Sequence, residues 1–337
     1  MDFKRVAIIG TDYISVSIAL GLKAQSRPPE IVGYGADRVA TDLARAQGAF
    51  DWVERKPGQT CRDADLVIVA RPLAVMRETL AAIALHLQPG CLVTDTAPLK
   101  TPVMRWADEL LPPSVFFAGG HLVLNPVTVG LETLGGLDTA RADLLTEALY
   151  CFTTPPGVPG EVISAFAGLA QMLDAHPFFI DDTEHDGLLA GIEGLPDLLA
   201  IALLRATVDT PGWQEMHKFA GQRFAVATEA AANAAERHTA VFLNREHILR
   251  RLNHLLTELV RLRDLLVQDD AGSLEETFVA AAEGRAHWLE GHGRGVWEQS
   301  VGVKVDRVPS ASQQVRRMFF GERFAQRREE ADPSREK

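Results

Sequence analysis

The sequence predicts a two-part α/β protein, with a doubly wound parallel sheet in the N-terminal part and only helices in the part that follows. The first part alternates short apolar, β-branched stretches with stretches of helical spacing, which is typical of parallel strand–helix–strand units. From about residue 186 onward every apolar pattern has helical spacing. The chain of 337 residues is long enough for two cores. We therefore expect one domain over residues 1–182, a helical dimerisation domain over 183–305, and a partly mobile extension over 306–337.

The first 35 residues contain the pattern around which the rest is organised. Residues 4–10 are an apolar run that breaks at Gly10, residues 11–24 have apolar side chains four apart, and residues 30–35 return to a strand pattern. This is the opening unit of a Rossmann-type dinucleotide-binding fold, in which a diphosphate binds at the first turn. The candidate cofactor contacts in that turn are Gly10, Thr11, Asp12, Tyr13 and Ile14.

This turn lacks two of the three glycines that are usual in dinucleotide-binding folds. The usual pattern G-x-G-x-x-G corresponds to Gly10, Asp12 and Ser15, so only the first position is a glycine. The Asp12 carboxylate would occupy the place where a diphosphate meets bare N–H groups and the positive end of a helix. The fold signal is strong, but we expect weak binding of NAD or NADP.

Asp37 and Arg38 follow the second strand, in the loop that normally recognises the ribose. An acidic side chain at the strand end would hold the 2′-hydroxyl, but that position is Gly35. Asp37 could contact the ribose or could cap the helix that begins near Val39. Arg38 could pair with a 2′-phosphate, which favours NADP over NAD.

Further strands are predicted at residues 65–70, 90–95 and 115–118, with helices at 72–87 and 100–110. Ligands of such sheets collect at the carboxyl ends of the strands. The loops at Gly10, Gly35, Arg71, Asp95 and His121 should therefore converge, and Ala70, Pro72 and Asp95 are added to the candidate cofactor contacts. Asp95 and Lys100 could equally form a solvated ion pair.

The composition argues against nucleic acid or an anionic membrane as a partner, because the net charge is −11. No apolar stretch reaches membrane-spanning length without charge, and the N-terminus runs straight into a strand, which leaves no room for a signal peptide. Cys61, Cys91 and Cys151 lie far apart and in no metal-ligand spacing. This pattern favours a reduced, cytoplasmic protein, and no metal site is expected.

The helical part should form a homodimer. Apolar residues recur at three and four between residues 241 and 266, which predicts one long amphipathic helix. A core helix is the alternative interpretation. A helical half with so much leucine cannot bury it alone, however, so a dimer interface is favoured.

Five stretches, in order, resemble motifs of the prephenate dehydrogenase family, and the likeness covers about residues 4–290. The family patterns G-L-G-L-I-G-G-S-L-A, D-x-x-S-V-K, G-G-H-P-M-A-G, H-D-x-x-x-A-x-x-S-H-L-P-H and A-N-R-E correspond to residues 10–19, 95–100, 119–125, 185–197 and 243–246. The resemblance implies NAD(P)-dependent oxidative decarboxylation of a small-molecule substrate, prephenate or arogenate, in tyrosine biosynthesis. It also implies that His121 accepts the proton of the ring hydroxyl.

Several departures from the family motifs fall at positions where the family contacts its substrate. Pro98 stands where the family has a serine, and Gly194 and Asp197 replace two histidines, the second of them a substrate contact. The region of the family's binding arginine keeps Arg223 but has Ala227 at the expected position. Pro98, Asp197 and Arg223 are therefore the candidate substrate contacts.

These departures leave alternatives to the family's reaction open. One is a catalytically impaired member that acts as a dimeric binding or scaffold protein, and another is a dehydrogenase for a different, less anionic substrate. The His185–Asp186 pair retains the family's H-D, but it could simply begin a helix with Asp186 near the N-cap.

Overall fold

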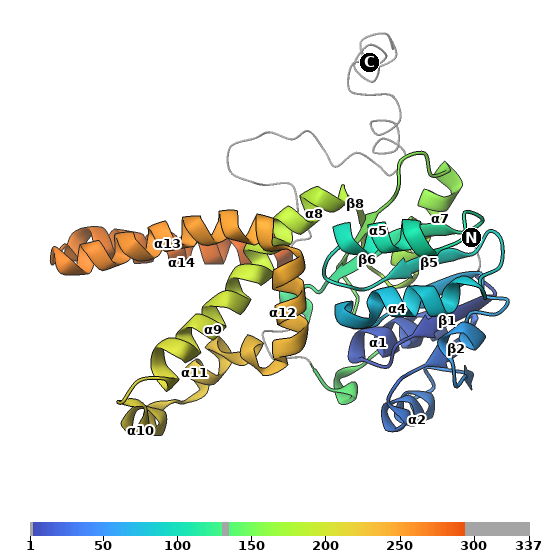
Figure 1. The fold of residues 1–337 in the computed structure, drawn as a ribbon, viewed down its shortest axis with the longest axis horizontal. Coiled ribbons are helices and arrows are strands. Elements are labelled where there is room, and N and C mark those ends of the chain that lie inside the picture. The colour runs from blue at the N-terminus through green and yellow to red at the C-terminus, as the bar shows by residue number, and fades with distance from the viewer. Residues whose placement is uncertain (1–2, 130–134, 294–337) are drawn as a thin grey trace, which may run out of the picture.

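The computed structural model describes residues 3–129 and 135–293 and contains one eight-stranded sheet with helices on both faces (Figure 1). The strand order is β3-β2-β1-β4-β5-β6-β7-β8. Their bounds are β1 Arg5–Ile9, β2 Glu30–Tyr34, β3 Trp52–Val53, β4 Leu66–Val69, β5 Leu92–Asp95, β6 Phe116–Val123, β7 Leu149–Thr153 and β8 His176–Phe179. The reversal of strand order at β1 and β4 confirms the doubly wound sheet.

Two apolar cores hold the sheet between its helix layers, because the central strands are buried on both faces. One core joins alternate strand residues such as Ile8 and Ile68 to α1 (Tyr13–Lys23) and α7 (Gly160–Met172). The other joins the intervening residues such as Ile9 and Val69 to α4 (Leu73–Ala84) and α5 (Thr101–Leu110). Cys61, Cys91 and Cys151 are free and buried. The remaining elements of this part are α2 Arg38–Ala46, α3 Pro57–Thr60, α6 Pro126–Val129 and the short 3₁₀ turn η1 Leu137–Thr139.

One strand pair departs from the parallel sheet expected from the sequence. β6 and β7 are antiparallel, and β6 continues five residues beyond the predicted end at residue 118. Gly119-Gly120 resembles a turn, but a Cβ at Gly120 would lie 2.4 Å from the Asp95 carbonyl oxygen. Glycine therefore lets the strand pass close to β5. As a result His121 lies inside a strand, opposite Cys151, and not in a loop.

The second part is helical throughout its described residues, as the sequence predicts. The sheet ends at Phe179, and α8 begins at Asp182. The helices are α8 Asp182–Leu189, the π-helical turn η2 Ala190–Gly194, α9 Leu195–Val208, α10 Trp213–Met216, η3 His217–Phe219, α11 Gln222–Ala227, η4 Glu229–Asn233, α12 Ala234–Leu243, α13 Arg245–Val267 and α14 Ala271–Gly293. The helix predicted over 241–266 is thus two helices, broken at Asn244. The predicted extension 306–337 lies outside the described residues.

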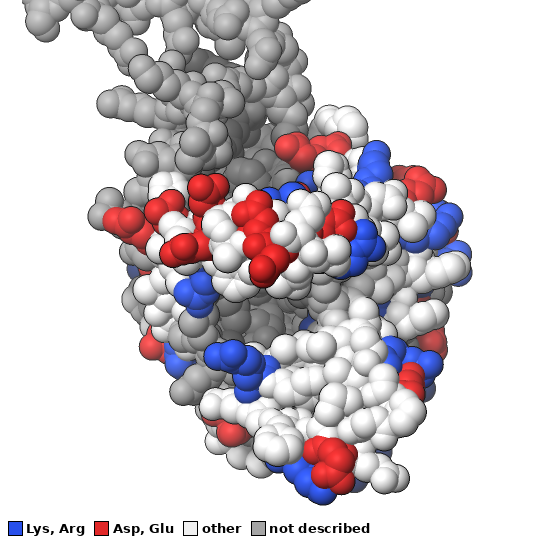
Figure 2. All heavy atoms as spheres, turned by 90° about the vertical axis from the view of Figure 1, so that its left-hand side faces the viewer, with Lys and Arg blue, Asp and Glu red and all other residues white. Residues whose placement is uncertain are grey.

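The helical part exposes a large apolar surface. Helices α13 and α14 form an arm that projects from the sheet domain, and α9 to α11 extend beside it (Figure 1). In Figure 2, where the arm points toward the viewer, the surface below it, formed by α9 to α11, carries few charged side chains. Its exposed apolar side chains include Leu199, Ile201, Leu203, Met216, Phe219 and Val226. The stretch Asp182–Val208 is also, by length and composition alone, apolar enough to cross a membrane, although it contains Glu193 and Asp197.

Candidate active site

His121 is the first member of a buried chain of side chains that joins the two parts of the protein. The side chain lies on β6, and the residue is only 6% exposed. Its Nδ1 lies 3.0 Å from Nε2 of His185 on α8. The Nδ1 of His185 in turn lies 3.0 Å from Oδ1 of Asp186. The imidazole predicted from the sequence as the base is therefore held by a second histidine and a carboxylate.

Asp186 anchors this chain to the start of α5. Its Oδ1 accepts a hydrogen bond from the Lys100 N–H at 2.8 Å, and its Oδ2 accepts one from the Thr101 N–H at 2.9 Å. Burial alone would raise the pKa of Asp186, but the hydrogen bonds that it accepts from His185, Lys100 and Thr101 hold the pKa below its usual value. The interpretation of Asp186 as a cap of its own helix is wrong, because Asp181 caps α8.

The order of these contacts determines which nitrogen of His121 is basic. An ionised carboxylate only accepts hydrogen bonds, so His185 carries its proton on Nδ1 and its Nε2 is an acceptor. The Nδ1 of His121 must then be the donor, which leaves a lone pair on Nε2. Burial, followed by the nearby His185 and Lys100, holds the pKa of His121 well below 6.5. His121 is therefore a neutral base at physiological pH, and its Nε2 lies 3.6 Å from Oε1 of Glu193.

A second buried group, Asp95 with Lys100, supports the strand that carries His121. Lys100 Nζ lies 2.7 Å from Asp95 Oδ2 and donates to the Gly120 carbonyl oxygen at 2.5 Å. Asp95 Oδ1 accepts from the Gly120 N–H at 3.0 Å. Neither Asp95 nor Lys100 is exposed, so the expectation of a solvated pair is wrong. Asp95 is the last residue of β5, at the edge expected for cofactor contacts, but its carboxylate is buried in the protein.

The turn after β1 has the backbone that a dinucleotide site requires. Gly10 has a φ of +156°, and a Cβ there would lie 2.1 Å from the Ala70 carbonyl oxygen. Only glycine permits this packing between the ends of β1 and β4. Thr11 lies against Gly35 at the end of β2, where a Cβ would fall 2.5 Å from the threonine Oγ1. The ends of β1, β2 and β4 thus lie together at one edge of the sheet, and Ala70 and Pro72 follow β4 there.

The start of α1 is already capped by a side chain. Asp12 Oδ1 accepts a hydrogen bond from the Ser15 N–H at 2.7 Å, so one donor at the positive helix end has a carboxylate partner. Asp12 itself is exposed. The fit to a dinucleotide therefore holds for the backbone of the turn, while Asp12 competes with a diphosphate for one N–H. Burial and the nearby Asp12 raise the pKa of Tyr13 at this helix start, and Arg237 opposes the shift.

The ribose loop resolves one open alternative. Asp37 caps α2, and its Oδ1 accepts hydrogen bonds from the N–H groups of Val39 at 2.8 Å and Ala40 at 3.4 Å. The Arg38 side chain is 94% exposed and has only a 3.8 Å ion pair with Asp42. Arg38 is therefore available to an anion at the end of β2, whereas the Asp37 carboxylate already has a structural role.

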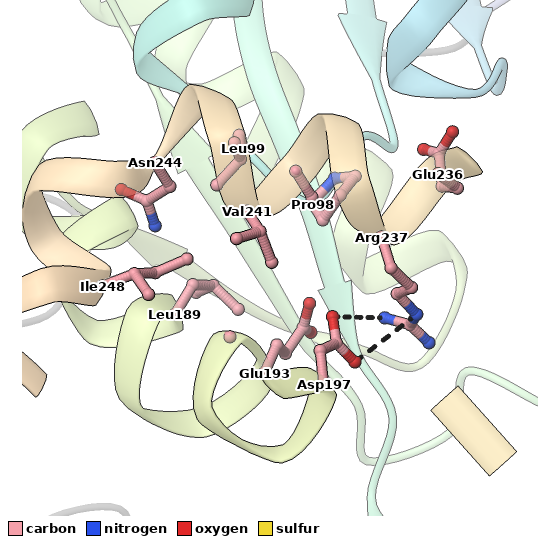
Figure 3. Close-up of a pocket in the computed structure, with 12 residues that line it drawn as sticks. Pro98, Leu99, Leu189, Glu193, Asp197, Glu236, Arg237, Val241, Asn244 and Ile248 are labelled. Atoms are coloured by element: carbon pink, nitrogen blue, oxygen red, sulfur yellow. Dashed lines mark hydrogen bonds and ion pairs between the residues drawn. The ribbon is translucent and has the colours of Figure 1, made fainter. Parts of the chain in front are cut away.

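A cavity lies between the β5–α5 loop and the helical part (Figure 3). Pro98 and Leu99 form one wall, Glu193 and Asp197 another, and Arg237 on α12 faces the two carboxylates. A wider hollow of about 780 Å³ continues from it past Ala227, and Glu193, Asp197 and Arg237 line both. The structure thus brings Pro98 and Asp197 together. Arg223 is exposed on α11 and lines neither hollow, but Ala227 lines the wider one.

Comparison with protein-family models accounts for both parts of the chain. Residues 18–177 match the model described as "Prephenate dehydrogenase, nucleotide-binding domain", and residues 181–280 match "Prephenate dehydrogenase, dimerization domain". The chain belongs to the prephenate dehydrogenase family. Its sheet part is the family's nucleotide-binding domain, and its exposed helices belong to the family's dimerization domain.

Curated relatives of this family match over most of the chain. The prephenate dehydrogenase of Bacillus subtilis is 26% identical over 285 residues, which are 83% of this chain and 75% of the relative. The cyclohexadienyl dehydrogenase of Zymomonas mobilis is 24% identical over 286 residues, which are 84% of this chain and 95% of the relative.

Solved structures of the family share the fold. The structure of prephenate dehydrogenase from A. aeolicus, in complex with hydroxyphenyl propionate and NAD+, matches with a TM-score of 0.74 and 19% identity. The match covers 85% of this chain and 99% of that one. Synechocystis arogenate dehydrogenase matches with a TM-score of 0.66 and 20% identity, over 84% and 99% of the two chains.

The structure also explains one departure from the family motifs. Gly194 stands where the family has a histidine, and a Cβ there would lie 2.9 Å from Ile248 Cδ1. A side chain at residue 194 would therefore require Ile248 of α13 to move. Within the described residues no group of three or more His, Cys, Asp or Glu side chains is placed to hold a metal ion.

Sequence reasoning missed two residues of the cleft. Glu193 lies at the serine position of the family's S-H-L-P-H stretch, so comparison of that motif position by position could have found it. Arg237 lies on α12, forty residues from its partner Asp197, and no local pattern marks it.

Proposed function

We propose that this chain is an NAD(P)-dependent dehydrogenase that oxidises and decarboxylates prephenate or arogenate. The observation that carries the proposal is the Asp186–His185–His121 chain, which leaves a basic Nε2 on β6 next to the proposed dinucleotide site. A protein that acted only as a scaffold would not need a buried, tautomer-fixed base, because such groups cost stability when they are buried.

His121 has two tasks in this reaction. Its Nε2 accepts the proton of the ring hydroxyl while the carbon that bears it is oxidised, and the nicotinamide supplies the hydride acceptor when it is bound. Loss of the ring carboxylate as CO₂ then gives a phenolate, and His121 returns the proton to it. The family's serine would also contact the substrate hydroxyl, but Pro98 cannot donate a hydrogen bond. His185 and Asp186 therefore orient the base without that serine.

The dinucleotide would bind across the ends of β1, β2 and β4. Residues 10–14 would hold the diphosphate, residues 70–72 would lie beside the nicotinamide half, and Arg38 would be available to a 2′-phosphate. This arrangement supports NADP as well as NAD.

Turnover measurements test the proposal directly. The purified chain is mixed with prephenate or L-arogenate and with NAD or NADP, and formation of the reduced cofactor is followed by absorbance at its nicotinamide band. We expect turnover with at least one of the four pairs, together with release of CO₂. Absence of turnover with all four would contradict the proposed reaction.

We propose that the assembly is a cytoplasmic homodimer. The exposed apolar side chains of α9 and α13, among them Leu199, Leu203, Leu256 and Val260, support this proposal. A second copy of the chain would cover them, as expected for isologous packing of a helical domain. Sedimentation of the purified protein tests this, and a monomer at micromolar concentration would contradict it.

A further inference from the structure

The charged side chains of the cleft form an unusual set for an enzyme that binds a dianion. Among the described residues that line the two hollows, the acidic ones are Glu193, Asp197, Glu229 and Glu236, and Arg237 is the only basic one. Glu236 is already used, because its Oε1 accepts the Leu73 N–H at 2.8 Å. Glu193, Asp197 and Glu229 remain. Glu193 and Asp197 lie one helical turn apart, with their carboxylates side by side and facing Arg237 (Figure 3).

The contact between Asp197 and Arg237 is loose. Arg237 Nε and Nη1 lie 3.5 Å from Asp197 Oδ1 and Oδ2, whereas charge-assisted hydrogen bonds are normally about 2.7–2.9 Å long. Arg237 Nε is buried and has no hydrogen-bond partner in the described part of the chain. The arginine therefore has a donor to offer to a further acceptor.

The negative charge of Glu193 and Asp197 exceeds the positive charge that Arg237 supplies to the cleft. Burial raises the pKa of Glu193 to about 7, with Asp197 adding to the shift and Arg237 opposing it. Burial also raises the pKa of Asp197. Both shifts mean that the negative charges are disfavoured where they lie, and a cation bound between them would relieve this cost.

We propose that the substrate carries an α-ammonium group beside its carboxylate, so that this chain acts on the amino acid arogenate in preference to the keto acid prephenate. The inference rests on the proposed function and specifies its substrate. The residues lie in the required order along the cleft: His121, then Glu193 at 3.6 Å from its Nε2, then Asp197 with Arg237. With the ring hydroxyl at His121, the opposite ring carbon lies at the Asp197 end, and that carbon bears both the side chain and the leaving carboxylate.

Asp197 and Arg237 then complement the two charges of the substrate's amino-acid side chain. A substrate carboxylate accepts from Arg237, and the ammonium donates to Asp197, with Glu193 as a second acceptor. Prephenate has the same two carboxylates but a carbonyl in place of the ammonium, so it would bring two negative charges against Glu193 and Asp197 with no positive charge of its own to compensate them. Ala227 lines the same hollow, where the family's arginine would have supplied that compensation.

Substrate preference in the wild-type chain and in Asp197→Asn tests the inference. We expect kcat/KM for L-arogenate to exceed that for prephenate by at least tenfold in the wild type. Asp197→Asn removes the charge and keeps the size, so it should lower this ratio at least tenfold, mainly through loss of arogenate turnover. The ratio is measured within one preparation, so partial unfolding of the variant does not affect it. Asp209→Asn at the C-cap of the same helix is the matched control, and its ratio should equal that of the wild type, because Asp209 forms an ion pair with Arg205 and lines neither hollow.

Calorimetry separates failure of this inference from failure of the proposed reaction. L-Tyrosine and 4-hydroxyphenylpyruvate, the products expected from the two substrates, are titrated into the protein with NAD present. Tighter binding of tyrosine that Asp197→Asn abolishes supports the inference, even in a chain without turnover. Equal or tighter binding of 4-hydroxyphenylpyruvate overturns it, as does equal or better turnover of prephenate, and the proposed reaction stands in the latter case.

Discussion

Replacement of His121 by asparagine should lower kcat by about 10²–10⁴-fold, the usual contribution of a positioned general base. Asparagine has about the same reach and can still donate to His185 Nε2, so the chain of hydrogen bonds persists while no group remains to accept the substrate proton. His176→Asn is the matched control. His176 also pairs with a glutamate, at 2.7 Å from Glu147, but it lies on β8 and is half-exposed. A His121→Asn variant with kcat within threefold of wild type would show that another group accepts the proton.

The pH profile of the wild type checks the same assignment. The base must be unprotonated, and burial together with His185 and Lys100 holds the pKa of His121 well below 6.5. We therefore expect protonation of His121 to lower kcat only below about pH 6.5, so that any change of kcat near pH 7 reports Glu193, whose pKa is about 7. An unperturbed histidine, which the sequence alone would suggest, would instead give a rise centred at about pH 6.5.

Asp186→Asn should be nearly as damaging, because it reverses the direction of the hydrogen bonds. The carboxylate accepts from His185 and from the Lys100 N–H at Oδ1, and from the Thr101 N–H at Oδ2. An asparagine has one acceptor and one donor end, so its donor must face either the Thr101 N–H or both His185 and the Lys100 N–H. With the donor toward His185, the protons of His185 and His121 shift, and His121 Nε2 carries a hydrogen in place of its lone pair. A comparable loss of the correct tautomer costs about 10⁴ in a Ser-His-Asp triad.

The same substitution should also lower stability, by about 1–3 kcal/mol, because a buried N–H group at the start of α5 loses its charged partner. Asp181→Asn is the matched control on the same helix. Asp181 is the N-cap of α8, and asparagine serves there equally well, so both kcat and the melting temperature should stay near wild type. If Asp186→Asn lowered only the melting temperature and kept kcat, Asp186 would be a helix cap and not a positioning residue of the base.

Much of the nucleotide-binding half could be predicted from the sequence because its signals are local. Apolar runs such as residues 5–9 and 66–69 can be buried on both faces only as central strands. Gly10 marks the turn because its backbone conformation and its packing against Ala70 exclude a side chain. Asp37 as a helix cap was one of two predicted roles, since capping depends on residues two and three positions away.

The antiparallel pair was missed because its partners are far apart in sequence. Residues 119–120 resemble a turn until β5 lies beside them, and only then does the need for glycine become a matter of close packing. Residues 149–153 pair with the extension of β6 across about thirty residues.

The sequence by itself determined the fold class and the family and predicted the base, because each depends on residues that are close together or on motifs of fixed spacing. The tertiary structure decided what that base can do. His185 and Asp186 come from α8, Glu193 from η2 and Arg237 from α12, and packing of these helices against the sheet brings them to His121 or to the cleft beside it. The protonation states and the charge balance of the site depend on which groups lie in contact and how far they are desolvated. Neither the contacts nor the desolvation can be inferred directly from the order of the residues.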